Sequence, residues 1–171
     1  MSTSAFIVPV PEAEPLVADL RARHDASAAL GVPAHLTVLY PFMAPERLTP
    51  AVRATAERAI AQVPAFNFVL GRVARFPATA YLVPAPAAPF VALTQALVQA
   101  FPDYPPYGGE HAGVVPHLTA AHGSAADAEA AFEVLAARLA ARGPVRSCCD
   151  QVLLIDNASG RWVTRWICPL A

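Results

Sequence analysis

The sequence predicts a pseudo-symmetric α+β fold made of two similar halves. The tripeptide His-Leu-Thr occurs twice, at 35–37 and at 117–119, 82 positions apart. An apolar run interrupted by alternating prolines precedes each copy, at 6–11 and at 81–86. Five His and eight Thr in 171 residues would give only about 0.2 His-x-Thr motifs by chance. The repetition therefore indicates an internal duplication, with approximate repeat units at 5–76 and 80–168.

The first half is expected to run strand, helix, motif strand, helix, strand pair. In order, we expect a strand at 5–10, a helix at 12–24, a loop at 25–34, a strand at 35–40, a helix at 50–63 and strands at 66–76 and 80–83. Leu16, Val17 and Leu20 stand at the spacing of an amphipathic helix. Thr49 followed by Pro50 is typical of a capped helix start, and Pro41 ends the motif strand.

The second half repeats this order. In sequence, we expect a strand around 81, a helix at 89–101, a loop at 102–114, the second motif strand, a helix at 125–142, and a final strand pair at 145–155 and 161–168. Ser124 is a capping residue, and Gly143 with Pro144 ends the long helix. No linker-like segment separates the halves, so we expect one domain over 1–171.

Composition limits the classes of partner. The chain is 56% hydrophobic and 15% charged, which excludes a disordered protein. Its net charge is -1 and all 12 basic residues are Arg, so it offers no surface for long nucleic acid. No run of 18 apolar residues is uninterrupted, and the N-terminus lacks the basic start of a signal peptide. We therefore expect a cytoplasmic monomer that needs neither membrane nor cofactor, with its three cysteines reduced.

The two motifs contain the residue types that suit metal-free phosphodiester cleavage. In a strand, positions i and i+2 share a face, so His35 and Thr37 face together while Leu36 enters the core. The same alternation pairs His117 with Thr119. One imidazole can accept a proton from water while the other donates one to the departing oxygen. The Thr hydroxyls can donate hydrogen bonds to the nonbridging phosphate oxygens.

The paired motifs resemble those of a known family. His35-Leu36-Thr37-Val38 and His117-Leu118-Thr119-Ala120 are similar to the paired His-x-Thr motifs of the two-histidine phosphoesterase superfamily. This group includes 2′-5′ RNA ligase-like proteins and RNA cyclic phosphodiesterases. The stretch His-Leu-Thr-Val-Leu-Tyr-Pro-Phe, at 35–42, is especially similar to bacterial 2′-5′ RNA ligase-like members. The resemblance covers nearly the whole chain in the order of its elements.

This resemblance implies a bilobal fold, with two antiparallel sheets lining a central cleft and helices on the outside. It also implies hydrolysis or formation of a phosphodiester, typically a 2′,3′-cyclic phosphate on an RNA end or a nucleotide. His35 and His117 would supply acid and base, in that order of preference, and Thr37 and Thr119 would hold the phosphate. RNA-active relatives often carry an Arg shortly after the second motif, whereas Ala120, Ala121 and His122 follow here. The substrate is therefore expected to be a small nucleotide or an RNA end.

Several further residues are candidates for substrate contact. Aromatic stacking on a base is expected from Tyr40, Phe42 and Tyr107, with Tyr104 a further candidate and Phe42 equally well placed for the core. His122 is a candidate contact, although strand alternation would turn it to the face opposite His117. The possible phosphate partners are Arg47, Arg72, Arg75, Arg161 and Arg165, none of which the sequence singles out.

Two alternatives to hydrolysis stay open. A nucleotide-binding or regulatory module could retain the cleft without turnover, and ligation of RNA ends would be the reverse reaction. A metal site is not expected: His111, His117 and His122 cluster in the sequence, but no acidic residue lies between 111 and 126 to complete a ligand set. No Gly-rich phosphate loop or nucleophile elbow is present.

Overall fold

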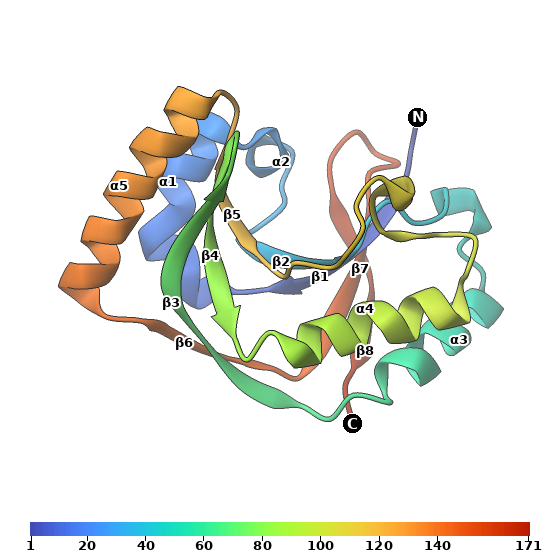
Figure 1. Ribbon diagram of the computed structural model, residues 1–171. Coiled ribbons are helices and arrows are strands. Elements are labelled where there is room, and N and C mark those ends of the chain that lie inside the picture. Colours follow the sequence, from blue (N-terminus) through green and yellow to red (C-terminus); the bar gives the residue numbers. More distant parts are fainter.

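A computed structural model describes residues 1–171 (Figure 1). The strands are β1 Ser4–Pro9, β2 His35–Leu39, β3 Phe66–Phe76, β4 Thr79–Ala85, β5 Leu118–His122, β6 Val145–Cys149, β7 Gln151–Asp156 and β8 Val163–Pro169. The α-helices are α1 Glu14–His24, α2 Ala26–Ala29, α3 Pro50–Ile60, α4 Ala88–Ala100 and α5 Ala125–Arg142. Short 3₁₀ turns lie at Pro11–Ala13, Pro45–Arg47 and Pro106–Gly109.

The eight strands form one curled antiparallel sheet in the order β6-β3-β4-β5-β2-β1-β7-β8. A single residue pair, Leu36 with Leu118, joins β2 to β5 at its middle. On either side of this pair stand four strands, which we name the β5 half (β6, β3, β4, β5) and the β2 half (β2, β1, β7, β8). The α+β class is confirmed, and the two expected sheets meet edge to edge as one.

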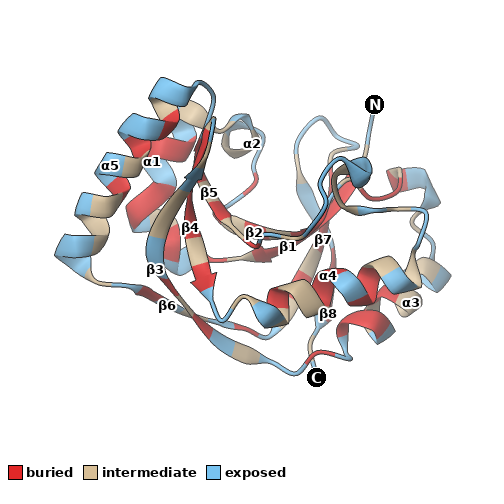
Figure 2. Cartoon of the chain, in the orientation of Figure 1, coloured by how far each residue is buried: buried red, intermediate tan, exposed pale blue.

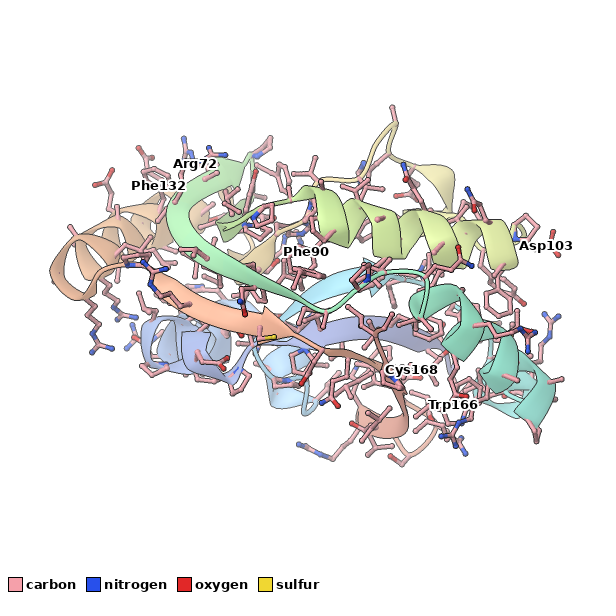
Figure 3. The ribbon with its side chains drawn as sticks, turned by 90° about the horizontal axis from the view of Figure 1, so that it is seen from below. Arg72, Phe90, Asp103, Phe132, Trp166 and Cys168 are labelled. Atoms are coloured by element: carbon pink, nitrogen blue, oxygen red, sulfur yellow. The ribbon has the colours of Figure 1, made fainter.

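The helices cover the outer face of the sheet and leave its concave face without a long helix (Figure 1). Helices α1 and α5 pack on the β5 half, and α3 and α4 pack on the β2 half. Buried residues concentrate between helices and sheet (Figure 2), in one core cluster of 36 residues that includes members of both halves. Seen from below, Phe90 of α4 and both Trp166 and Cys168 of β8 lie on this covered side (Figure 3). No helix combines the length and the apolar character needed to cross a bilayer.

Helices from distant parts of the chain are tied together on the β5 half. Arg138 of α5 donates two hydrogen bonds to the Asp19 carboxylate of α1, at 2.7 and 2.8 Å, and a third to the carbonyl oxygen of Leu16. The hydrogen bond and the charge of Arg138 lower the pKa of Asp19 to about 2. These contacts hold the two helices in place behind the motif strand β5.

The C-terminal strands differ from the expected pair. The predicted strand at 145–155 is two strands that break at the exposed Asp150. Strand β6 pairs with β3 at the edge of the β5 half, whereas β7 pairs with β1 and β8 in the β2 half. The chain therefore crosses from one half to the other at Asp150, and each half contains strands from both approximate repeat units.

The expected helix starts are present. The Thr49 hydroxyl accepts the Val52 N–H, and Ser124 forms a capping box with Asp127. In that box the Ser124 hydroxyl accepts the Asp127 N–H at 3.0 Å, and the Asp127 carboxylate accepts the Ser124 N–H at 3.2 Å. These bonds satisfy backbone donors that the first helical turn would otherwise leave unpaired.

Replacing Ser124 by Ala is expected to lower the free energy of unfolding by about 1 kcal/mol, because the cap of α5 is lost. Urea denaturation followed by circular dichroism measures this change. Ser2→Ala, at an exposed position before β1, is the control and should leave the midpoint unchanged. Equal stability of the two variants would show that the capping box contributes nothing.

Candidate functional site

The two motif histidines are held in the same way. His35 is the first residue of β2, and His117 directly precedes β5. The His35 Nδ1 lies 2.7 Å from the carbonyl oxygen of Pro33, and the His117 Nδ1 lies 2.7 Å from that of Val115. A carbonyl oxygen only accepts, so each Nδ1 carries the proton and donates it. In the neutral ring this leaves Nε2 as the free acceptor at both positions.

Strand register brings the two motifs together. Leu36 lies opposite Leu118, and both leucines are fully buried in the core on the helix-covered side. Alternation therefore turns His35 and Thr37 toward the concave face, together with Thr119. Because β2 and β5 are antiparallel, extending this register by one residue in each direction brings Thr37 next to His117 and His35 next to Thr119. All four polar side chains are half-buried and surround the junction of the halves.

Both imidazoles favour the neutral form. Burial lowers the pKa of His35 to about 4, against a smaller opposing effect of its hydrogen bond to Pro33. The nearby positive charge of Arg21 and the proximity of His117 lower it further, whereas Asp25 raises it. Burial also lowers the pKa of His117, and the bond to Val115 acts against this. Near pH 7 the site therefore holds two unprotonated rings in the absence of an anion.

Two aromatic residues that the sequence did not single out surround His117. The His117 ring centroid lies 5.4 Å from that of Phe76 and 5.3 Å from that of Tyr81, both in edge-on arrangements. Tyr81 pairs with Thr119 across β4 and β5, whereas Ile7 takes the corresponding place opposite Thr37. The repeat of proline-rich runs in the sequence matched Phe6 to Tyr81, but the strand register matches Ile7. His117 thus has two aromatic rings beside it, and the strand partner of the motif threonine is aromatic in the second motif and aliphatic in the first.

Tyr107 lies beside Thr37. Burial raises the pKa of Tyr107, and a hydrogen bond with the Thr37 side chain acts against this rise. The Tyr107 N–H also donates to the carbonyl oxygen of Tyr40 at 2.6 Å. Its φ of 52° lies in the left-handed region, which a residue with a bulky side chain adopts at a cost. The loop before the second motif therefore carries a tyrosine into the site of the first.

Tyr40 is the most exposed of the expected aromatic contacts. It is 39% exposed, and its ring lies edge-on to Trp162 with centroids 6.3 Å apart. Trp162 belongs to the loop between β7 and β8, so this pair stands at the concave side of the β2 half together with Ile7. Tyr40 keeps a surface that a base could cover.

Phe42 belongs to the core, which corrects the expectation that it contacts substrate. Only 4% of its surface is exposed. Its ring packs against Phe6, Phe101 and Tyr104, with centroids 5.0, 5.1 and 5.0 Å away. Tyr104 is thereby also committed to packing, and Arg47 lies over its ring at 5.9 Å. A bulky ring enclosed by three others has no free face for a base.

His122 lies on a different face from the one strand alternation suggested. The register of β4 and β5 shifts between Ala80 and Tyr81, so that Tyr81 pairs with Thr119 and Thr79 with His122. This bulge returns His122 to the side of Thr119. Its Nδ1 lies 2.7 Å from the Thr79 hydroxyl, and the residue is exposed. His122 is therefore a third imidazole on the concave side, at the end of β5.

Of the arginines considered as phosphate partners, some are already bonded to protein groups and others are exposed. Arg165 pairs with Asp156 at 2.8 Å, and Arg161 donates to the carbonyl oxygen of Ala29 at 3.2 Å. Arg72 and Arg75 are exposed on β3. No group of three or more His, Cys, Asp or Glu side chains lies together as metal ligands would. A cavity of about 490 Å³ is lined by residues of α1, of α2 and of the turn that ends at Pro33, and neither motif histidine is among them.

The chain matches a known family over most of its length. The family described as the 2′-5′ RNA ligase superfamily matches residues 9–161. The protein belongs to the 2′-5′ RNA ligase superfamily. This confirms the resemblance seen in the two motifs. No curated protein sequence matches the chain.

Solved structures share the fold of this superfamily member. E. coli LigT complexed with NADP+ is 17% identical, with 99% of this chain and 98% of that one covered and a TM-score of 0.59. LigT complexed with 3′-AMP is 15% identical, with coverages of 99% and 95% and a TM-score of 0.58. The protein TT0787 of Thermus thermophilus is 16% identical, with coverages of 98% and 97% and a TM-score of 0.60. These likenesses show a shared fold over the full length.

Acidification is expected to destabilise this superfamily member through His35. An unfolded imidazole titrates near pH 6.5, whereas the pKa of His35 in the folded protein is about 4. Between these values the unfolded chain binds more protons than the native one, so stability falls as the pH falls. The loss between pH 7 and pH 5 should be about 1–2 kcal/mol.

Urea denaturation at a series of pH values measures this dependence. In His35→Gln the slope between pH 7 and pH 5 should become shallower, because the titrating group is gone. His24→Gln, at the end of α1, is the matched control. An identical slope in the wild type and in His35→Gln would mean that His35 is not held neutral by the fold.

Proposed function

We propose that this protein is a metal-independent phosphodiesterase that hydrolyses a 2′,3′-cyclic phosphate on an RNA end or a small nucleotide. One observation carries the proposal: two imidazoles, each oriented by the carbonyl oxygen two residues upstream, stand beside the pair that joins the two halves. Each has a Thr hydroxyl two residues further along its strand. Membership of the 2′-5′ RNA ligase superfamily supports this chemistry.

The reaction needs one proton accepted and one donated. The Nε2 of one imidazole takes a proton from water as its oxygen attacks phosphorus, and the other protonated imidazole gives its Nε2 proton to the departing ribose oxygen. The P–O bond to that oxygen breaks, leaving a phosphomonoester and a free hydroxyl. Thr37 and Thr119 donate hydrogen bonds to the nonbridging oxygens, on which charge builds up in the transition state.

The sequence favoured His35 as the acid and His117 as the base. The different surroundings of the two histidines support the opposite assignment. His35, with its pKa held at about 4, stays unprotonated and fits the base. Burial lowers the pKa of His117 as well, so His117 fits the acid once a substrate phosphate favours its protonation. His117 then accepts the proton that it later gives to the ribose oxygen.

A small nucleotide fits the surface better than a long RNA. The net charge is -1, and Arg138, Arg165 and Arg21 are engaged in ion pairs. Tyr40 and Tyr107 lie on the β2 side of the site, where a base could stack. Structures of E. coli LigT with NADP+, 3′-AMP and ATP concern nucleotides of this size.

His35→Ala and His117→Ala are each expected to reduce hydrolysis of 2′,3′-cyclic nucleotides by at least about 10²-fold, because each removes one proton-transfer group. Separation of 2′- and 3′-monophosphate products by chromatography measures the rate and shows which ribose oxygen leaves. The matched control is His24→Gln on the outer helix α1, which should retain full activity. EDTA should leave the rate unchanged.

Full activity in either Ala variant would refute the shared site. Calorimetry with the same nucleotides separates the remaining alternative, a binding module without turnover. Micromolar affinity together with no hydrolysis in the wild type would identify that alternative.

A further inference from the structure

The segment that leads into His35 is braced on several sides. This segment, residues 25–34, contains α2 and ends one residue before the imidazole. The Glu14 carboxylate accepts the N–H of Ala34 at 2.7 Å. From the loop after β7, Arg161 donates to the carbonyl oxygen of Ala29 at 3.2 Å, and the Trp162 N–H donates to that of Leu30 at 2.9 Å. The middle and the last residue of the segment are thus tied to neighbouring elements.

A buried ion pair also ties this segment to helix α1. The Arg21 side chain is only 3% exposed, and its Nε lies 3.0 Å from the Asp25 carboxylate. Its Nη2 donates to the Ser27 hydroxyl at 3.2 Å. Asp25 also caps α2, because its other oxygen accepts the Ser27 N–H at 3.0 Å and the Ser27 hydroxyl at 2.7 Å. Burying a guanidinium is costly unless it is paired, so this arrangement is expected to be rigid.

At its glycine, this segment lies close to the loop between β7 and β8. Gly31 has a φ of +100°, which side-chain-bearing residues rarely adopt. A Cβ at this position would lie 3.2 Å from the Arg161 Nη2 and 3.3 Å from the Trp162 carbonyl oxygen. The segment is therefore pressed against the loop between β7 and β8. Two residues further on, the carbonyl oxygen of Pro33 in the same segment holds the imidazole.

We propose that Arg21 and Asp25 form a positioning pair for His35: together they fix the segment whose Pro33 carbonyl oxygen orients the imidazole. The inference rests on the proposed function, in which His35 transfers a proton. Neither residue touches the reacting atoms. Their part is to set where the His35 ring stands and how readily it takes a proton.

The charges around His35 support opposite effects. Arg21 on α1 and His117 before β5 lower the pKa of His35, and Asp25 at the end of α1 raises it. Glu14 and Arg161 also stand at the segment, where each is bonded to backbone. The loop before His117 has no such ion pair: its Tyr107 N–H bonds to Tyr40 instead. Only the segment before His35 is therefore held by an ion pair of this kind.

The test uses two neutral variants of similar shape. Arg21→Met keeps the packing of the aliphatic stem, and Asp25→Asn keeps a side chain that can cap α2. Both loosen the same segment, so a purely structural role would move the two variants alike. An electrostatic role moves them apart: the pKa of His35 should rise in Arg21→Met and fall in Asp25→Asn. Arg23→Met on α1 and Glu129→Gln on α5, both at exposed positions, are the matched controls.

The readout is the NMR titration of the His35 Cε1 proton, assigned by its absence in His35→Gln. Because it needs no turnover, it remains valid if the protein fails to hydrolyse cyclic nucleotides, and the two proposals fail separately. Where hydrolysis is measurable, the acidic limb of kcat/KM should shift in the same two directions. Shifts of equal sign in both variants, or shifts no larger than those of the controls, would overturn the proposal.

A second comparison tests the proposal if Arg21→Met does not fold. If Arg21→Met is unfolded, Arg21→Lys retains the charge and Asp25→Asn removes its partner. The expected result is a His35 pKa close to wild type in Arg21→Lys and a lowered one in Asp25→Asn. An unchanged or raised pKa in Asp25→Asn would contradict the pair on its own.

Discussion

The pairing of Leu36 with Leu118 is the contact on which the rest of the site depends. It is the only pair that joins β2 to β5, and both leucines are fully buried. Because side chains alternate along a strand, burying these two leucines commits the flanking His and Thr residues to the opposite face. A shift of one residue in this register would send the polar side chains into the core. Core packing and the placement of the polar groups are therefore one constraint.

The same local hydrogen bond orients each imidazole, and burial then favours its neutral form. A bond from Nδ1 to the carbonyl oxygen two residues upstream fixes the tautomer without an acidic partner. A carboxylate at that place would favour the imidazolium, whereas a neutral carbonyl does so only weakly. Desolvation then prevails, and the pKa of His35 falls to about 4. A substrate phosphate would supply the missing negative charge, so protonation of the site is coupled to binding.

Local pattern predicted the parts of the structure that depend on neighbours in the sequence. The duplication, the caps at Thr49 and Ser124, and the outward direction of the motif side chains all follow from spacing and strand alternation. Phe42 could not be assigned this way, because its burial depends on rings from residues 6, 101 and 104. The face of His122 depends on a bulge, which inserts one unpaired residue and leaves no mark in the pattern of Ala-Ala-His. Tyr81 was missed because its pairing with Thr119 is a matter of register between strands.

The two motifs form similar half-sites whose supports differ. Before His35 stands a segment tied by Arg21, Glu14 and Arg161, and before His117 stands a longer loop that carries Tyr107 across to Thr37. A proton acceptor profits from a fixed position, because the attacking water must be aligned with phosphorus when the proton leaves. The longer loop instead brings the Tyr107 side chain to Thr37 of the other motif. Because the two connections differ, two similar strands can present their histidines for the unlike tasks of accepting and donating a proton.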